Sequence, residues 1–342
     1  MSKISEIKFL PAENGDCILI KLGDPVDTSI LVDGGTSNTY PHLHEELSEL
    51  YEKCPKNYIF LTHCDDDHIG GLMEFFDKDT SLLKYITTVF YNYPRELEKN
   101  HPNVAGHIQE PQISKNTSGN LSPDQLKKFT KLLEESGVEV VSKVYTDYKF
   151  PEDKNFKITI LSPRKKTLDS FNDWIEPKLG FLSRPSDWNV AISKLANEYR
   201  DKKDTSKTNA SSISFILEYN EKNYLFLADA LSTDIVESLN DIGYSEEHKI
   251  NASLVKVSHH GSKYNTSHGL LDLIRCKRFV VLTNGKIHLH PDKESLAKII
   301  HHNQDACLLF NYEFDFDKLF SEQDHKEYPY FSYQVIKRSI IE

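Results

Sequence analysis

Short apolar runs separated by turn residues open the chain, and each run predicts a β-strand. These runs lie at residues 6–10, 17–22, 29–32, 58–61 and 86–91. Asn14-Gly15 and Gly34-Gly35 supply turn signals between the first strands. Leucines at helical spacing predict a helix over 41–53, and a second helix is expected to begin within 71–76. This alternation of strand, loop and helix indicates a layered α/β protein.

The second half of the chain follows the same order, with strands first and helices after. Strands are expected at 138–144, 156–161, 211–219, 224–227, 252–257 and 278–282. Helices are expected at 121–136, 233–240, 268–273 and 294–301. The shared order of the two halves favours a sandwich of two sheets with helices outside.

Two long polar stretches, at about 93–135 and 164–208, interrupt this pattern. We interpret both as insertions into one domain that spans 1–342, with 303–342 as a C-terminal extension. A functional lid is the alternative interpretation of 164–208.

Composition narrows the class of protein. Of 342 residues, 38% are hydrophobic and 27% charged, which is typical of a globular protein with a buried core. Lys and Arg number 41 against 52 Asp and Glu, giving a formal net charge of −11. This acidic balance disfavours broad, charge-driven binding of nucleic acid, because that binding depends on Lys and Arg neutralising phosphates. It leaves open a local, metal-lined site.

Targeting and cysteine signals favour a cytoplasmic protein without a membrane partner. No apolar run approaches the ~18 residues that a membrane-spanning helix needs, and the first residues turn acidic too early for a signal peptide. The 5 cysteines are scattered and include no CxxC pair, so neither a disulfide framework nor a zinc–thiolate site is supported.

The strongest chemical signal is a group of potential metal ligands directly after the predicted strand 58–61. His63, Asp65, Asp67 and His68 lie there, before Gly70-Gly71. Imidazole and carboxylate together suit divalent Zn, Mn or Fe. The alternative is a solvent-exposed acidic loop with a helix-capping carboxylate, but that interpretation leaves both histidines unexplained.

Residues 63–71 match the pattern HxDxDHxGG at each specified position, and further blocks follow in order over roughly residues 4–300. The sequence here resembles the metallo-β-lactamase fold, and within it the nuclease-like branch of the ComEC/Rec2 competence proteins. The other blocks that carry the resemblance are Leu10–Cys17, Ile30–Gly35, Asn209–Ser212, Leu227–Ala230, Lys256–Ser262 and Thr283–Pro291. The opening block departs from that branch by Asn in place of Gln and Ala in place of the first Gly, and Ala228 and Leu289 also stand where the branch has glycine.

The resemblance implies an α/β, αββα sandwich of two mixed sheets and a centre with two divalent metal ions, Zn²⁺ or Mn²⁺. It implies that His63 and Asp65 hold one ion, that Asp67 and His68 hold the other, and that Asp229 bridges them. His260 and His290 would complete the two ligand sets, with His259 as the alternative to His260. Asp67, Lys256 and His259 are implied as catalytic residues. Because Asp65 replaces an imidazole, Mn²⁺ competes better with Zn²⁺ than in an all-histidine site.

Several neighbouring residues have two interpretations each. Lys256 is a candidate to bind a phosphate oxygen, with a solvent-exposed lysine at a strand edge as the alternative. Asn209 and Ser262 either hydrogen-bond the substrate or the metal ligands, or cap ordinary turns. Asp16 and Asp33 either support the metal loop or serve the fold alone. His288 is a further candidate because it lies two residues before His290.

Two aromatic segments, 90–93 and 328–333, could stack on nucleobases, although packing in the core is the commoner role of such segments.

The resemblance implies hydrolysis of a phosphodiester, in DNA or a nucleotide-like molecule, by a hydroxide that two metal ions activate. Contact with nucleic acid would be local. The second hypothesis is hydrolysis of a small ester, lactone or phosphorylcholine-type substrate. The third is a metal-stabilised, non-enzymatic partner subunit of a defence or uptake complex.

Overall fold

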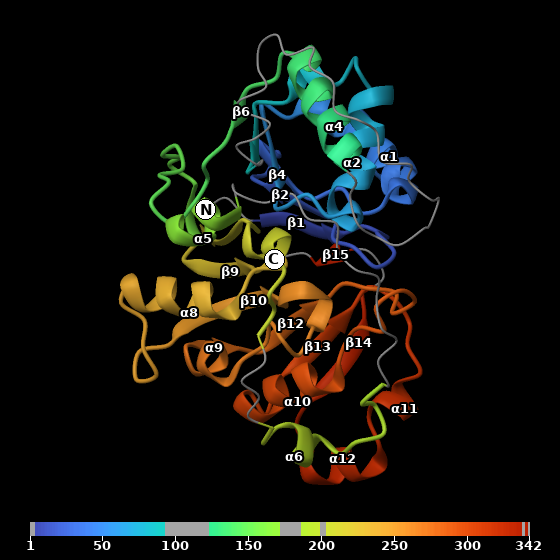
Figure 1. Cartoon of the computed structure of the whole chain (residues 1–342), viewed down its shortest axis with the longest axis vertical. Helices are drawn as coiled ribbons and strands as arrows, with labels where there is room; N and C mark the ends of the chain where they lie inside the picture. Colours follow the sequence, from blue (N-terminus) through green and yellow to red (C-terminus); the bar gives the residue numbers. More distant parts are fainter. Residues whose placement is uncertain (1–3, 93–122, 172–185, 199–202, 337–338, 341–342) are drawn as a thin grey trace.

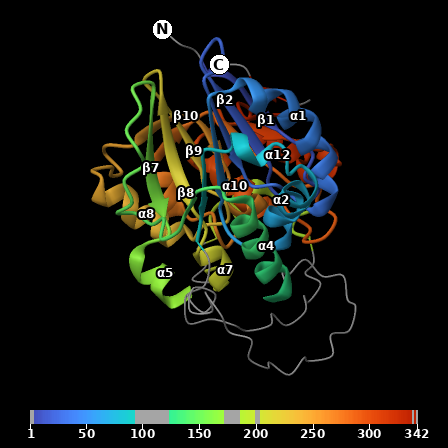
Figure 2. The same cartoon turned by 90° about the horizontal axis from the view of Figure 1, so that it is seen from above.

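The strands of the protein form two mixed sheets packed face to face, with helices on both outer faces (Figure 1). The computed structural model describes residues 4–92, 123–171, 186–198, 203–336 and 339–340. Viewed from above, the two sheets lie between α1 and α2 on one side and α8 on the other (Figure 2). The predicted four-layer α/β architecture is therefore confirmed.

The first sheet has the strand order β15-β1-β2-β3-β4-β5-β6. Its strands are β1 (Ile4–Phe9), β2 (Ile18–Leu22), β3 (Thr28–Val32), β4 (Lys56–Leu61), β5 (Thr88–Tyr91), β6 (Val140–Val141) and β15 (Ser339–Ile340). Strands β1 to β3 pair antiparallel, whereas β3, β4 and β5 run parallel. Its outer face packs against α1 (Tyr40–Lys53), α2 (Asp66–Lys78) and α4 (Pro123–Ser136).

The second sheet has the order β14-β13-β12-β10-β9-β8-β7, with β11 paired to β10. Its strands are β7 (Phe156–Ser162), β8 (Ser214–Tyr219), β9 (Lys222–Phe226), β10 (Ile250–Lys256), β11 (Ile274–Cys276), β12 (Arg278–Val281), β13 (Cys307–Phe310) and β14 (Ser332–Val335). Its outer face packs against α8 (Ser232–Asp241), α9 (His268–Asp272) and α10 (Lys293–His302).

Short helical segments connect these elements. They are α5 (Lys165–Phe171), α6 (Ile192–Leu195), α7 (Lys207–Ala210), α11 (Phe316–Leu319), α12 (Glu322–Glu327) and the 3-10 turns η1 (Ser37–Thr39), η2 (Leu83–Tyr85) and η3 (Ser258–Gly261). In the described part of the chain, no helix combines the length and the apolar character needed to cross a membrane.

The side chains of β4 alternate between two core layers. Tyr58 and Phe60 point into the core between the sheets, and Ile59 and Leu61 point toward the helices. Both faces are buried, so the strand appears in the sequence as a continuous apolar run. Phe60 stacks on Phe90 with ring centroids 4.6 Å apart. Packing in the core is therefore the role of the aromatic pair at 90–91.

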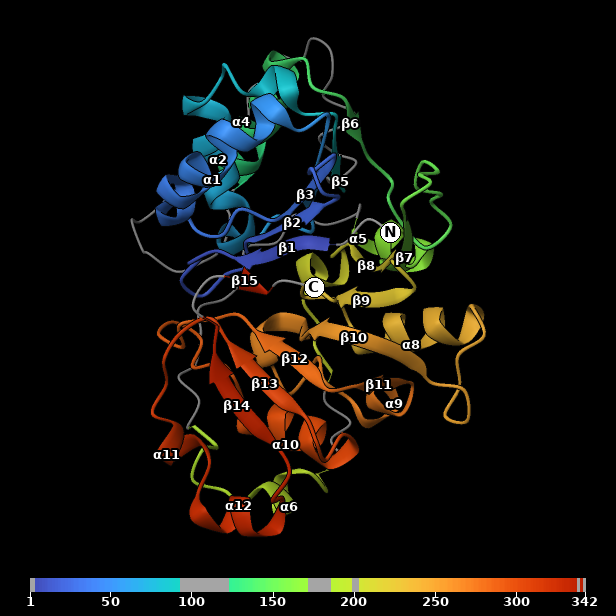
Figure 3. The ribbon, with the colours of Figure 1, turned by 180° about the vertical axis from the view of Figure 1, so that it is seen from behind.

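The C-terminal residues supply strands to both sheets. β13 and β14 extend the second sheet, and β15 pairs antiparallel with β1 at the edge of the first (Figure 3). Tyr333 stacks on Phe316 and Phe320, so packing explains this part of the aromatic tail segment, whereas Tyr330 is 73% exposed. The sequence patterns predicted no strand here, because each strand is short and none has a long apolar run.

Two other predicted elements differ from the structure. The strand predicted over 138–144 is reduced to β6. The helix predicted to begin within 71–76 begins at Asp66, so Asp67 and His68 belong to its first turn. Of the predicted insertions, 93–122, 172–185 and 199–202 lie outside the described residues, and the remaining parts include α4 to α7.

Candidate metal centre

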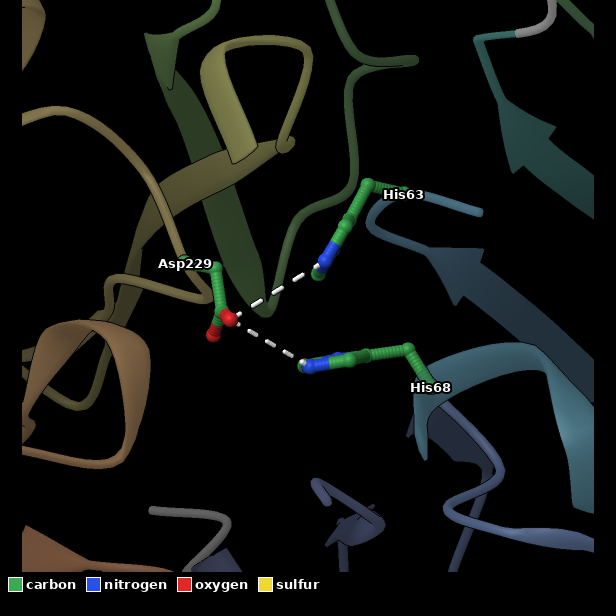
Figure 4. Close-up of side chains that lie close together, drawn as sticks. All are labelled: His63, His68 and Asp229. Carbon is green, nitrogen blue, oxygen red and sulfur yellow. Dashed lines mark ion pairs between the residues drawn. The ribbon is translucent and has the colours of Figure 1, made fainter. Parts of the chain in front are cut away.

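The candidate ligands follow the carboxyl ends of parallel strands in both sheets. β3 and β4 lead to Asp33 and His63, while β9 and β10 lead to Asp229 and the pair His259-His260. Parallel strands place their carboxyl ends at one edge of a sheet, which is where α/β proteins bind ligands. Here those edges of the two sheets meet, and Figure 4 shows His63 and His68 directed from the first half toward Asp229 of the second.

One oxygen of Asp229 lies at the centre of the cluster. Its Oδ2 is 3.6 Å from the Nε2 atoms of His68, His259 and His260, and 3.9 Å from Nε2 of His63. Asp229 is 3% exposed. Four imidazole nitrogens thus converge on one buried carboxylate oxygen, and the bridging role of Asp229 stays a prediction.

The start of α2 adds two more carboxylates. Asp67 Oδ2 lies 3.6 Å from Nε2 of His260, and Asp65 Oδ2 lies 3.8 Å from Nε2 of His63. Asp65 occupies the N-cap position of α2, but its side chain makes no capping hydrogen bond. Asp65 therefore does not cap the helix with its carboxylate, contrary to the alternative interpretation of this acidic segment. Asn14 donates to Asp67 Oδ2 at 2.8 Å and fixes that carboxylate from the neighbouring loop.

Asp33 orients two imidazoles from behind. His68 Nδ1 donates to Asp33 Oδ2 at 2.7 Å, and the Thr62 hydroxyl donates to the same oxygen at 2.8 Å. His63 Nδ1 lies 3.0 Å from the Thr62 hydroxyl oxygen and donates a hydrogen bond to it. The Thr62 amide also donates to Asp33 Oδ1 at 2.7 Å. With Nδ1 occupied on both rings, each Nε2 faces the cluster, as in metal sites where a carboxylate fixes the tautomer.

Several of these inward-facing atoms have no hydrogen-bond partner among the described residues, although they are fully buried. They are Nε2 of His63, His68 and His260 and Oδ1 of Asp229. A buried polar atom without a partner costs about 1–3 kcal/mol, so a cluster of them needs an explanation. Divalent ions would satisfy all of these atoms together. The residues present therefore fit a bound metal.

The cluster divides into overlapping groups that could each hold an ion. His63, His68 and Asp229 form one group, and Asp67, His68 and His260 form another. Within each group, one ligand atom per residue lies within 4.8 Å of the others. These buried His and Asp groups are consistent with a dinuclear metal site.

The carboxylates of the cluster shift the pKa values of the imidazoles. Burial opposes the charged form of His68, but Asp229 and Asp33 outweigh burial and raise its pKa well above the usual range. Desolvation likewise opposes the charged form of His259, whose side chain is 25% exposed, but Asp229 and Asp204 raise its pKa to about 9. Burial lowers the pKa of His63. Without metal, protons on His68 and His259 therefore balance the carboxylates at neutral pH.

Lys256 lies inside the protein, not at a solvent-exposed edge. Its side chain is 1% exposed, its ammonium pairs with Asp16, and it donates to the Ala228 carbonyl at 3.0 Å. The exposed-lysine interpretation is therefore wrong, and the contact with a phosphate oxygen stays a prediction. Burial opposes the ionised form of Asp16, but Lys256 and His260 lower its pKa to about 2. This buried ion pair links Asp16 of the first half of the chain to Lys256 of the second.

The other predicted residues lie around the cluster in different roles. Asp16 reaches the metal loop through its amide, 3.3 Å from the Asp67 carbonyl. Ser262 accepts from the amide of Tyr264 at 3.3 Å, an ordinary turn contact. Asn209 donates to Asp204 at 2.7 Å. His290 is not part of the converging groups: its ring lies 5.4 Å from that of His259 and 6.1 Å from that of His288. The ligand role of His290 stays a prediction.

The two departures from the glycine pattern fall at left-handed backbone positions. Ala228 has φ 45° and Leu289 has φ 56°. Glycine adopts this region without the steric cost that a Cβ brings. Each of these residues therefore carries the steric cost of a Cβ in this region, directly beside Asp229 and close to His290.

Several supporting residues escaped sequence reasoning. Asn14, Thr62, Asp204 and Asn265 each hydrogen-bond a candidate ligand or its partner. Asp204 lies in a charged stretch where no spacing distinguishes it from its neighbours, so the sequence carried no signal for it. Asn14 belongs to the opening block but was interpreted only as a turn residue.

Residues 10–123 match the family model described as the metallo-beta-lactamase superfamily. Curated protein sequences include no match. Similar solved structures include the metallo-beta-lactamase fold protein YhfI from Bacillus subtilis, 11% identical with TM-score 0.46, covering 98% of each chain. Unliganded yeast PDE1 is 10% identical with TM-score 0.43, covering 99% of this chain and 100% of that one. Zn²⁺-bound PqqB from Methylobacterium extorquens is 10% identical with TM-score 0.42, covering 96% and 87%.

Proposed function

Because the chain has the metallo-β-lactamase fold of two mixed sheets flanked by helices, we propose that it is a metal-dependent hydrolase of phosphodiesters. The observation that carries this proposal is the set of buried Nε2 atoms on His63, His68 and His260 that surround Asp229 at 3.6–3.9 Å without a hydrogen bond. A structural cluster would pair these atoms with each other or with the backbone, whereas a metal centre leaves them free for ions.

The chain's own residues prepare the site before any ion binds. Asp33 holds the ring of His68 and, through Thr62, the ring of His63. Asn14 fixes Asp67, and the Leu282 carbonyl accepts from His260 Nδ1 at 2.8 Å. Zn²⁺ or Mn²⁺ bound there would supply Lewis acidity and lower the pKa of water. The fixed rings mean that little reorganisation accompanies metal binding.

A phosphodiester is the substrate class that we propose, in DNA or a nucleotide-like molecule. The mixed imidazole and carboxylate donors suit the ions that stabilise in-line displacement at phosphorus. The resemblance of residues 63–71 to the ComEC/Rec2 nuclease-like branch supports the same substrate class. With a net charge of −11, contact with a nucleic acid would be confined to the neighbourhood of the metal centre.

Metal analysis and a substrate panel test the proposal together. The pure protein, loaded with Mn²⁺ or Zn²⁺ and freed of excess ion, should hold two ions per chain. It should then cleave bis-p-nitrophenyl phosphate, single-stranded DNA or duplex DNA. Less than one ion per chain after loading would overturn the hydrolase proposal. Turnover of an ester or lactone with no phosphodiester cleavage would overturn only the substrate class.

A matched pair of variants separates the site from the surrounding helix. Asp67→Ala removes a buried carboxylate of α2, and Asp77→Ala removes an exposed one from the same helix, with a side chain 48% exposed. Asp67→Ala should lower activity by at least about 100-fold, while Asp77→Ala should keep it. Equal activity of the two variants would contradict the assignment of α2 to the site.

A further inference from the structure

The two adjacent histidines after β10 both reach the centre of the cluster. His259 and His260 have φ 46° and 53°, and this pair of left-handed residues turns the chain sharply at η3. Their Nε2 atoms are each 3.6 Å from the same oxygen of Asp229. Neighbouring residues of a strand would point to opposite faces, so the strained turn is what brings both rings to one place.

Each ring is held from its other nitrogen by different partners. His260 Nδ1 donates to the Leu282 carbonyl. His259 Nδ1 lies 3.0 Å from Asn265 Oδ1 and 3.2 Å from Asp204 Oδ2, so two acceptors compete for its proton. A carboxylate behind a histidine that fixes its tautomer and directs Nε2 inward is a recurring feature of metal ligands.

Asp204 is itself firmly placed. Its Oδ1 accepts from the Ser206 amide at 2.8 Å, and its Oδ2 accepts from the side-chain amides of Asn209 at 2.7 Å and Asn265 at 3.0 Å. The side chain is 10% exposed. A carboxylate with this many donors is a rigid support for the imidazole, not a surface charge that happens to lie nearby.

The same short segment also reaches the other side of the cluster. Thr208 of α7 donates to Asp65 Oδ2 at 3.3 Å. Residues 204–209 therefore contact both Asp65 and His259, while Asp67 lies 3.6 Å from His260. The segment 204–209 thus links Asp65 to His259, whereas Asp67 contacts His260 directly.

We propose that His259 and His260 are both metal ligands, one for each ion, and that Asp204 is the positioning residue that directs His259 to the ion shared with His63 and Asp65. This inference rests on the proposed function, because it assigns ligands within the same centre. It makes the segment 204–209 part of the metal site and not a connection outside it.

Asp204→Asn tests the positioning role, because it keeps the size of the side chain and removes its charge. The matched control is Asp272→Asn: Asp272 Oδ1 lies 3.2 Å from Nδ1 of His302, an Asp–His pair outside the cluster. We expect Asp204→Asn to lower the affinity for one of the two ions about 10- to 100-fold and to leave the affinity for the other unchanged. Asp272→Asn should bind both ions as the wild type does. Competition with a chelating indicator measures both affinities.

The visible absorption of protein loaded with Co²⁺ gives a second measurement. A purely structural role of Asp204 would leave this spectrum unchanged. In Asp204→Asn, the visible bands of one cobalt ion should shift or weaken, and Asp204→Glu should restore them in part. If Asp204→Asn does not fold, as judged by circular dichroism, His259→Gln takes its place with His302→Gln as control, and we expect the same loss of one ion.

The outcomes separate this inference from the proposed function. If wild-type protein binds no ions, the proposed function fails and the inference fails with it. If wild type binds two ions and both Asp204→Asn and His259→Gln also bind two with unchanged affinity, the proposed function stands and the ligand role of His259 is wrong. Loss of both ions in His259→Gln would also overturn the assignment of one histidine to each ion.

Discussion

Asp33 shows how one residue without a role in chemistry controls the geometry of the site. It lies at the end of β3 with φ 59°, and its carboxylate is fully buried. It holds His68 directly and His63 through Thr62. These donors compensate the charge of the buried carboxylate, which would be costly in the interior without partners.

Asp33→Asn should therefore weaken metal binding about 10- to 100-fold. Asp33 Oδ2 accepts from His68 and the Thr62 hydroxyl and Oδ1 accepts from the Thr62 amide, so an NH₂ group at either position faces a donor. Dialysis against buffered free metal, followed by elemental analysis, measures the change. Asp79→Asn is the control: Asp79 lies 3.0 Å from Nδ1 of His44, far from the cluster in sequence and contacts. Equal metal affinity in the two variants would contradict the orienting role of Asp33.

At the level of residues, the sequence supplied most candidates but not their surroundings. The spacing of His63, Asp65, Asp67 and His68 pointed to them without a structure. Lys256 was predicted to bind a phosphate oxygen, with an exposed strand edge as the alternative, and its burial against Asp16 was not foreseen, because nothing in the local pattern shows which distant carboxylate pairs with it. Asp204 was missed for the same reason: its partners His259 and Asn265 lie more than fifty residues away.

Among the elements, the start of α2 determines where the acidic ligands point. The helix begins at Asp66, five residues before the predicted interval, so Asp67 and His68 project from its first turn. The loop of the first hairpin closes against this turn. Asp16 donates its amide to the Asp67 carbonyl, and a Cβ added to Gly15 would lie 1.7 Å from that carbonyl oxygen. Only glycine allows this approach.

Gly15→Ala should consequently displace the first turn of α2. We expect a loss of about 2 kcal/mol in the free energy of unfolding, since a side chain is forced into filled space, together with weaker metal binding. Urea unfolding of the metal-free protein measures the stability. In Gly269→Ala of α9, an added Cβ meets nothing within 4 Å, so that variant should keep or slightly raise stability. Comparable losses in both variants would show that the Gly15 contact is unimportant.

On the scale of the whole molecule, the candidate metal centre lies between two halves that also meet through apolar packing and polar contacts such as the Lys256–Asp16 pair. His63, Asp67 and His68 come from the first half, and Asp229 and His260 from the second. An ion bound between them stabilises only the state in which the halves are assembled. Two divalent ions would also move the formal charge from −11 to about −7 and make the site locally electropositive.

Bound metal should therefore stabilise the entire chain, by about 2.7 kcal/mol per ion at a free concentration 100 times Kd. Thermal unfolding at fixed free Zn²⁺ or Mn²⁺ measures this, and amide exchange should slow in the loops of both halves. Protection confined to one half would contradict a site shared between them. Mg²⁺ at the same concentration is a control for general salt effects.

The stabilisation of the folded protein by bound metal should grow between pH 6.5 and about 9. The pKa of His68 is raised, and that of His259 is raised to about 9. In metal-free protein these protonated rings stabilise the fold below the unfolded pKa, about 6.5, and this stability is lost as pH rises through the folded pKa. Metal replaces those protons, so it binds more tightly as pH rises. If the stabilisation by metal instead decreases over this pH range, the assignment of His68 and His259 to the metal site is contradicted.

The sequence alone determined the layered α/β architecture, the metal-ligand spacing and the order of the blocks. These are local patterns: alternation of side chains along β4, apolar spacing in α1, and ligands packed into residues 63–68. The tertiary structure alone decided that Asp229 lies among four imidazoles, that Lys256 faces Asp16, and that Asp204 supports His259. Such pairings depend on how two sheets meet at their carboxyl ends, which no short stretch of sequence encodes.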